Sequence, residues 1–491
     1  MYDVIIIGGG IVGTATARAL SRYNLKIVLI ERAADIAVGA TKANSGILHA
    51  GYDCYPGTLK ADLNVKGAAM FPKLAEELDI PYRINGSMVI STEKDGPQKL
   101  KALYEKGRIN GVADMELLST KEALALEPNL THRITGALRA KTAGVISPYE
   151  AGIAFAENAA ENGVEFLLQT EVTHIKADKD GYSLWTSMNP GRYTGAIDNC
   201  SQLKGGEPIK TKVIINAAGI ESANIHNHIN PNKEEITPQR GQYYLLDNTQ
   251  RDLVHHTIFQ LPTPLGKGVL VVPTVDYNIL LGPTAEPPES PTATETTIEG
   301  LKEALDKVGL ILKSVPIRDR ITAYAGIRAK HSGKDFIVEE ASPGFINAIG
   351  IDSPGLTAAP AIAERIAELT TARLQPTHNP NFKAERIGIK RLRELSPSQQ
   401  AAIIKENPAY GRVVCRCETI TEAEVIDAIR RPIGARNLDA LKRRTRAQMG
   451  RCQGGFCKTR LMELLSKELN IPETAITMDG TGSELISLPL N

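Results

Sequence analysis

Near its amino terminus the chain reads Val4-Ile5-Ile6-Ile7-Gly8-Gly9-Gly10-Ile11-Val12-Gly13, an apolar, β-branched run followed by glycines. The run predicts a buried strand, and the periodic pattern that continues to Leu20 predicts a helix. A second apolar run at 26–30 predicts another strand, which ends at Glu31. A strand, a helix and a strand in this order predict a parallel sheet in an α/β fold.

The glycines at Gly8, Gly10 and Gly13 have the spacing of a Rossmann-like dinucleotide-binding turn. The first permits the tight turn, the second lets the backbone approach a pyrophosphate, and the third lets helix and strand pack closely. The helix N-terminus then faces the phosphate charge. The carboxylate of Glu31 can accept hydrogen bonds from both ribose hydroxyls, and it would repel a 2′-phosphate. The alternative is a turn that is merely rich in glycine, and the motif alone does not separate FAD from NAD.

The composition is typical of a soluble enzyme with more than one domain. The chain has 491 residues, of which 42% are hydrophobic, and its formal net charge is +1. A length of this kind predicts two or three domains. The near-zero charge does not favour nucleic acid or acidic membranes as partners. The longest apolar stretch, 4–17, is interrupted by glycines and is too short to span a bilayer. No secretory signal is present, so a cytoplasmic protein is expected.

Four of the six cysteines gather near the carboxyl terminus, as Cys415-x-Cys417 and Cys452-x4-Cys457. Four thiolates can hold a [2Fe-2S] cluster or a tetrahedral zinc ion. Zinc ribbons usually place two residues between the cysteines of each pair, so spacings of one and four favour the cluster over zinc or plain thiols. The isolated Cys54 and Cys200 are interpreted as structural thiols, and the whole pattern favours a reducing compartment.

Several segments of the first 375 residues resemble the FAD-dependent oxidoreductases that have an amino-acid-oxidase-like fold. Within them the chain is similar to L-2-hydroxyglutarate oxidases and to the large subunit of anaerobic glycerol-3-phosphate dehydrogenases. One such segment is Asn44-Ser45-Gly46-Ile47-Leu48-His49-Ala50-Gly51. The others are 56–60, 86–90, 216–219, 326–328 and 350–357.

The resemblance implies FAD as the cofactor. It also implies that the start of the helix after Gly350 faces the flavin, where free N–H groups stabilise negative charge on the reduced ring. The expected FAD contacts are Gly8, Gly10, Gly13, Glu31, Arg32, Thr41, Asn44, Ser45, Gly46, Val172, Ala218, Gly219, Gly350, Ser353, Gly355, Leu356 and Thr357.

Three residues are candidates for the substrate site. His49 is the candidate base for a hydroxyl proton because imidazole titrates near neutral pH, and the alternative is that it packs against the flavin or hydrogen-bonds a loop carbonyl. Arg328 matches the family position that binds the anionic end of the substrate, and its alternative is a surface salt bridge. A guanidinium suits a carboxylate or a phosphate because it donates two parallel hydrogen bonds. Arg240 is a candidate for the same cavity or for a structural role.

Two features point to different substrates. In glycerol-3-phosphate dehydrogenases the segment over the flavin usually carries a lysine and an arginine, and residues 351–360 carry neither. This favours a hydroxyglutarate-like substrate. Residues 413–418 and 449–457 resemble the bacterioferritin-associated ferredoxin-like [2Fe-2S] domain, which favours the anaerobic glycerol-3-phosphate subunit.

The expected function is therefore that of an FAD-dependent dehydrogenase acting on a small anionic secondary alcohol. The candidates are glycerol 3-phosphate and an L-2-hydroxy acid such as L-2-hydroxyglutarate. A hydride would pass to the flavin, and electrons would leave through the [2Fe-2S] cluster to a redox partner protein. The alternatives are an amino-acid or opine oxidoreductase and a non-catalytic electron-transfer subunit with flavin and cluster.

Further strand patterns at 212–216 and 345–349 predict that the nucleotide-binding domain is assembled from separated segments. We expect a Rossmann-like FAD-binding domain with an inserted α+β substrate domain and a small helical [2Fe-2S] domain. The expected bounds are 1–80, 145–220 and 322–375 for FAD binding, 81–144 and 221–321 for the substrate domain, 376–410 for a connector and 411–491 for the [2Fe-2S] domain.

A basic stretch at 430–451 contains eight basic residues and one acidic residue, Asp439. It has no aromatic side chain on which a nucleic-acid base could stack. Two interpretations stay open, a solvated surface and a docking patch for an acidic redox partner.

Overall fold

The computed structural model describes residues 1–188, 206–261 and 268–486. The first sheet has a parallel centre in which β1 pairs with β2 on one side and with β12 on the other. Residues Val4 and Ile6 face one core and Ile5 and Ile7 face another, so β1 is buried on both faces. The strands are β1 (Tyr2–Ile7), β2 (Ile27–Ile30), β9 (Glu165–Leu167), β10 (Thr170–Asp178), β11 (Gly181–Met188), β12 (Ile209–Asn216), β18 (Ile337–Ser342) and β19 (Phe345–Ile349).

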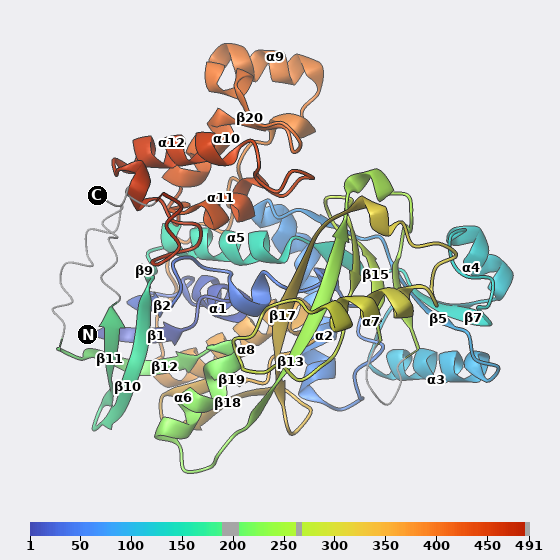
Figure 1. Ribbon diagram of the computed structural model, residues 1–491. Helices are drawn as coiled ribbons and strands as arrows, with labels where there is room; N and C mark the ends of the chain where they lie inside the picture. The colour runs from blue at the N-terminus through green and yellow to red at the C-terminus, as the bar shows by residue number, and fades with distance from the viewer. Residues whose placement is uncertain (189–205, 262–267, 487–491) are drawn as a thin grey trace.

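Four helices build the core on one face of this sheet. The helix after the glycine turn packs against two helices from distant parts of the chain, as the blue, teal and orange ribbons of Figure 1 show. They are α1 (Ile11–Leu20), α2 (Leu59–Leu78), α5 (Pro148–Glu161) and α8 (Gly355–Leu374). The predicted strand–helix–strand unit and the predicted assembly from separated segments are thus both present.

The second sheet belongs to the substrate domain and is mostly antiparallel. Its order is β17-β13-β16-β15-β14-β5-β7-β6. The strands are β5 (Ser87–Ser91), β6 (Met115–Leu118), β7 (Gly136–Ala140), β13 (Ile236–Leu246), β14 (Thr257–Gln260), β15 (Leu270–Pro273), β16 (Ile279–Gly282) and β17 (Arg320–His331). The helices beside it are α3 (Gly96–Ile109), α4 (Thr120–Leu126) and α7 (Ile298–Val308). A small sheet of β3 (Ile47–Leu48), β8 (Gly144–Ile146) and β4 (Tyr82–Arg83) lies where the two domains meet.

Two predicted domain boundaries differ from the structure. The boundary at 322 falls inside β17, which pairs with β13 along its length and so belongs to the substrate sheet up to His331. The boundary at 221 falls before α6 (Ser222–Ile229), which packs against β19 of the nucleotide-binding sheet. Here His226 contacts Asn347 through Nδ1 at 2.8 Å. Local patterns missed both because sheet membership depends on pairing between distant residues.

The carboxyl-terminal domain has its own apolar core. Its elements are β20 (Val413–Cys415), β21 (Ile420–Thr421), α10 (Glu422–Arg430), α11 (Leu438–Thr445) and α12 (Lys458–Leu469). Thr421 and Glu424 form the capping box that begins α10, since each side chain bonds the other's backbone N–H. In Figure 1 this orange and red domain lies against α5.

The segment predicted as a connector lies along the nucleotide-binding domain before it reaches α9 (Pro397–Glu406). Arg386 donates to Glu157 Oε2 at 2.7 Å and to the carbonyl of Leu78 at 2.7 Å. Glu157 is fully buried, and Arg431 of the carboxyl-terminal domain donates to the same oxygen at 2.7 Å. The segment is therefore part of the interface between the two domains.

The central arginines of the basic stretch 430–451 form neither a solvated surface nor an open patch, and both interpretations were wrong for them, whereas Arg430 and Arg451 at its two ends are exposed. Arg443 and Arg444 are buried and both bind Asp35 of the nucleotide-binding domain. Arg446 is buried between Glu418 and Asp276, a substrate-domain residue. These charges are used inside the molecule, where they join the carboxyl-terminal domain to the other two.

In the part of the chain that the structure describes, no helix is both long and apolar enough to cross a membrane. Cys54 is buried, as expected of a structural thiol, while Cys200 lies outside the described residues.

Candidate functional site

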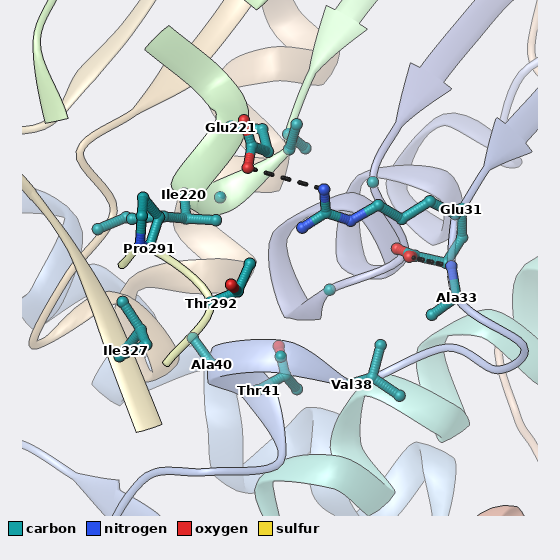
Figure 2. A pocket seen from close by; sticks show the side chains of 18 of the residues that line it. Glu31, Ala33, Val38, Ala40, Thr41, Ile220, Glu221, Pro291, Thr292 and Ile327 are labelled. Atoms are coloured by element: carbon teal, nitrogen blue, oxygen red, sulfur yellow. Dashed lines mark hydrogen bonds and ion pairs between the residues drawn. The ribbon is translucent and has the colours of Figure 1, made fainter. Parts of the chain in front are cut away.

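A cavity of about 1140 Å³ opens at the carboxyl ends of β1 and β2. Figure 2 shows Glu31 and Glu221 on opposite sides of it, with Thr41 below and Ile327 at one end. Eight of the expected FAD contacts line this cavity, namely Gly8, Gly10, Glu31, Arg32, Thr41, Val172, Ala218 and Gly219. A crevice at this edge of a parallel sheet is where such folds bind dinucleotides.

The glycine turn has the geometry that its spacing predicts. Gly8 has φ +109°, and a Cβ there would lie 2.4 Å from the carbonyl oxygen of Ala217. A Cβ on Gly13 would lie 1.9 Å from the carbonyl oxygen of Gly8, so helix and strand touch at this point. Gly10 precedes α1 and offers no side-chain cap, while Thr41 Oγ1 accepts from the Ile11 N–H at 3.0 Å. The cradle and the open helix end fit a pyrophosphate.

Glu31 is held by the backbone on both sides. Its Oε2 accepts from the N–H of Gly9 at 2.7 Å and its Oε1 accepts from that of Ala33 at 2.8 Å. Each carboxylate oxygen has a second lone pair, so hydroxyls of a ribose can still bind. Arg32 reaches across the cavity to Glu221, with 3.7 Å between NH1 and Oε1 (Figure 2).

Asn44, Ser45 and Gly46 lie beyond the cavity lining, and Asn44 shapes its own loop. Its amide nitrogen donates to the carbonyls of Ala40 and Thr41, and its Oδ1 accepts from the Gly46 N–H. The loop packs closely against the substrate sheet, since a Cβ on Gly326 would lie 2.1 Å from the carbonyl oxygen of Ala43. The backbone of this loop, more than its side chains, is therefore placed to shape this part of the cavity wall.

The segment before α8 forms a second open helix end. Gly350 has φ +70°, and Pro354 precedes the helix without a side-chain cap. Ile351 lines the cavity, whereas four expected FAD contacts of this segment do not, namely Gly350, Ser353, Gly355 and Leu356. Thr357 has a different part: its hydroxyl accepts from the N–H of His49 at 2.9 Å and donates to the carbonyl of Ile47 at 3.1 Å. It holds the His49 loop against α8.

His49 is buried and its ring packs on Tyr52 and Phe259, with centroid distances of 4.6 and 5.8 Å. Its Nδ1 accepts from the N–H of Gly51 at 3.1 Å. A neutral imidazole that accepts at Nδ1 carries its proton on Nε2. To accept a proton at Nε2, the ring must first carry its own proton on Nδ1, and the hydrogen bond from Gly51 is then lost. The observed contact therefore favours the tautomer in which Nε2 is a hydrogen-bond donor.

The two candidate arginines differ sharply. Arg240 is buried and binds two glutamates, with Nε at 2.9 Å from Glu286 and NH1 at 2.8 Å from Glu289. This placement favours the structural role. Arg328 is half-buried, and within the described residues it has no hydrogen bond or ion pair. It shares a face of β17 with Tyr324 and Gly326, which contact the loop at Ala43 and Asn44.

The four cysteines come together in the carboxyl-terminal domain. The Sγ atoms of Cys415 and Cys417 lie 3.7 Å apart, as do those of Cys417 and Cys452, and Cys457 contacts Cys415. A Cβ on Gly450 would lie 2.4 Å from Cys417 Sγ, so the loop approaches the sulfurs closely.

The four thiols differ in how easily they ionise. The hydrogen bond with Cys457 raises the pKa of Cys415, and burial raises that of Cys417, whereas the pKa values of the other two cysteines are lowered. Burial would raise the pKa of Cys452, but hydrogen bonds from Cys417 and from the N–H groups of residues 454–456 lower it overall. The hydrogen bond with Cys415 lowers the pKa of Cys457. The donor set and the close-packed sulfurs fit a [2Fe-2S] cluster.

Comparison with known proteins identifies the family of the larger amino-terminal part of the chain and that of the carboxyl-terminal domain. A model described as FAD dependent oxidoreductase matches residues 3–369, and one described as BFD-like [2Fe-2S] binding domain matches residues 413–467. The chain belongs to the FAD-dependent oxidoreductases. This oxidoreductase binds FAD and carries a [2Fe-2S] domain, and it therefore acts on a small substrate and hands electrons to an acceptor.

Among relatives of the oxidoreductase, a glycerol 3-phosphate dehydrogenase of Caloramator mitchellensis is 44% identical over 100% of this chain and 99% of its own. A human mitochondrial L-2-hydroxyglutarate dehydrogenase is 33% identical over 58% of this chain and 61% of its own. A solved structure, of L-alpha-glycerophosphate oxidase from Mycoplasma pneumoniae with FAD bound, is 31% identical with a TM-score of 0.72. It covers 78% of this chain and 98% of its own.

The sequence reasoning missed several residues of the oxidoreductase site. Lys42, Ala43, Tyr324 and Ile327 line the cavity although no role was expected of them. Tyr324 and Ile327 lie within four residues of Arg328 in the sequence. This proximity to a candidate substrate residue was the one feature that could have pointed to them. The partly buried pair of Lys60 and Asp352, 2.5 Å apart, links α2 to the loop before α8, and no local pattern predicts this pairing.

Proposed function

We propose that this oxidoreductase is a glycerol-3-phosphate dehydrogenase that passes electrons through its [2Fe-2S] domain. The observation that carries the proposal is the 44% identity with the Caloramator mitchellensis enzyme, because it extends over both domains. The mitochondrial relatives match only 58% of the chain. The substrate would be oxidised at its secondary hydroxyl, and the product would be the corresponding phosphorylated ketone.

Bound FAD supplies the acceptor for the hydride. The chain's own residues would then bind and orient the alcohol. Arg328 is our candidate for the phosphate, because its guanidinium is half-buried and has no ionic partner among the described residues. Two parallel hydrogen bonds would fix the anionic end and so orient the hydroxyl carbon.

His49 is our candidate for the hydroxyl group. In the tautomer that the Gly51 contact favours, Nε2–H donates to the substrate oxygen and orients it. After a shift of the proton to Nδ1 the same nitrogen accepts the hydroxyl proton. Tyr52 and Phe259 hold the ring in place for either role.

One observation favours a second substrate, L-2-hydroxyglutarate. Ile351 lines the cavity, and the segment 351–360 that it begins contains no lysine or arginine. Glycerol-3-phosphate dehydrogenases usually carry a lysine and an arginine in this segment, so their absence favours a substrate without a phosphate group. The redox partner in either case would be a separate acceptor protein, and the four thiols favour a cytoplasmic, reducing compartment.

The test is an anaerobic assay of the purified protein with an artificial dye as acceptor. Glycerol 3-phosphate, L-2-hydroxyglutarate and glycine are compared by kcat/KM. We expect the highest value with glycerol 3-phosphate. A higher value with L-2-hydroxyglutarate would favour the second substrate, and turnover of glycine alone would contradict both. Flavin that no substrate reduces would point to an electron-transfer subunit.

A further inference from the structure

The side chain of Phe456 is 88% exposed. A single exposed apolar residue is ordinary on a protein surface, but the position of this one is not. Phe456 stands directly before Cys457, a cluster ligand, in the loop that also carries Cys452. Cys417, a third ligand, is itself exposed. The cluster site therefore reaches the surface beside an aromatic side chain that the domain's own core does not bury.

The charges around this surface have one sign. The two ligand loops, 415–418 and 449–458, contain three cations, Arg416, Arg451 and Lys458, and one acid, Glu418. Glu418 is buried and holds two arginines, so its charge is neutralised inside.

The cations stay available to a partner. Arg416 is exposed, and it has no ion pair among the described residues. Arg451 contacts Asp247 at 3.2 Å but keeps 66% of its side chain exposed. We call Arg416, Cys417, Arg451, Phe456 and Lys458 the cluster face.

We propose that the cluster face docks an acidic protein that carries one electron at a time. The inference rests on the proposed function, because it assigns the acceptor of that reaction. An exposed aromatic side chain with arginines around it is the composition of an interface centre. Positive charge steers an acidic carrier to the one surface where the cluster is accessible.

An alternative is that the cations only offset the negative charge of the cluster. That role needs neither an exposed Phe456 nor side chains directed to solvent. This alternative also predicts that partner binding does not depend on the charge of the partner. Binding measurements with acidic and basic partners therefore distinguish the two interpretations.

The electron balance follows from the substrate. Oxidation of one secondary alcohol to a ketone releases two electrons and two protons. Each one-electron carrier is reduced once, so two carriers leave the cluster face for every alcohol oxidised. The protons pass to solvent.

Cytochrome c offers a matched pair of probes, because native cytochrome c is basic and its succinylated form is acidic on the same fold. Binding of each to the holoenzyme is measured by calorimetric titration at low and high salt. We expect the succinylated form to bind more tightly, and the difference to shrink at high salt. With glycerol 3-phosphate present, the enzyme should also reduce succinylated cytochrome c faster than native cytochrome c.

Two substitutions test the residues themselves. Arg416→Glu and Phe456→Ser should each weaken binding of the succinylated form by about tenfold or more. Arg133→Glu and Ile298→Ser are the matched controls, since both side chains are exposed in the substrate domain, and neither should change binding. Iron content and the paramagnetic signal of the reduced cluster should stay unchanged in all four.

Equal binding of the two cytochromes would overturn the proposal, as would normal binding by both cluster-face variants. The dye assay reports separately on the proposed function. Failure of glycerol 3-phosphate to reduce the dye, with binding of the acidic probe intact, would remove the substrate assignment and leave the docking face standing.

Discussion

Arg328 lies on β17 two residues from Gly326, whose backbone packs against Ala43 of the cofactor loop. If it holds the substrate's anion, Arg328→Lys keeps the charge but loses the two-pronged geometry. A hydrogen bond to a charged group contributes roughly 1.5–3 kcal/mol, so kcat/KM should fall about tenfold to a hundredfold. The FAD content should not change. Both are measured by dye-linked kinetics and by flavin release.

Arg320→Lys is the control for this change. Arg320 begins the same strand, is exposed and donates only to the carbonyl of Ile317. Its substitution should leave kcat/KM unchanged. Normal kinetics in Arg328→Lys would place that arginine outside the substrate site.

His49 gives the second prediction at this scale. If His49 is the group that takes the hydroxyl proton, His49→Ala should slow flavin reduction by substrate while substrate affinity stays nearer normal. Rapid mixing under anaerobic conditions measures the two separately. A loss of affinity alone would show that the ring serves binding and not proton transfer.

Among the elements, α11 carries the interface charges that join the cluster domain to the cofactor domain. Arg444 binds both oxygens of Asp35 at 2.8 Å, and Arg443 binds Oδ2 at 2.5 Å. Lys42, which lines the cofactor cavity, contacts Asp439 of the same helix at 3.1 Å. The helix therefore fixes the cluster domain against the wall of the FAD site.

Asp35→Asn should loosen this contact. Breaking a buried ion pair from one side costs about 3–5 kcal/mol because the remaining charge has no partner. We expect a lower Tm and easier release of the carboxyl-terminal domain by limited proteolysis. Asp62→Asn is the matched control, because the pair of Asp62 and Lys66 on α2 is exposed and contributes about 1 kcal/mol or less. Equal effects of the two changes would contradict the assignment.

The same pair predicts a pH dependence. Burial would raise the pKa of Asp35, but Arg444 and Arg443 lower it to about 2. The usual value for aspartate is about 3.9, so the pair stabilises the fold above that pH. The contribution is lost as the pH falls toward about 2. Acid unfolding followed by circular dichroism should show this loss in the native protein and not in Asp35→Asn.

For the whole molecule, two redox sites lie in separate domains with separate cores. Cys452→Ser should remove the cluster, because three thiolates and a hydroxyl hold iron poorly, while the FAD cavity, which lies outside the carboxyl-terminal domain, stays intact. Metal analysis should find little iron, and flavin content should be normal. Dye-linked oxidation should persist while reduction of a protein acceptor is lost.

Cys54→Ser is the control for the cysteine change, since Cys54 lies outside the ligand set and should leave the iron content unchanged. Full iron in Cys452→Ser would remove Cys452 from the ligands. One zinc ion per chain in the native protein would instead replace the cluster by a structural metal.

The parts of this protein that depend on local spacing can be predicted from its amino-acid sequence. The turn from Gly8 to Gly13, the acid at Glu31 and the four cysteines each combine residue type with position along a short segment. A tight turn, a helix end and a pair of thiolates form between near neighbours, so their signatures are written locally. The motifs also carried the family resemblance that the comparisons confirmed.

The roles of the charges that pair over long distances in the chain became clear from the three-dimensional fold. Arg240 was a candidate for the substrate, and the fold gives it Glu286 and Glu289. Arg443, Arg444 and Arg446 could be solvated or exposed to a partner, and the fold places the first two on Asp35 and the third on Asp276. A charged side chain finds its partner across hundreds of residues, and burial decides whether it meets solvent or a carboxylate. No pattern along the chain records that choice.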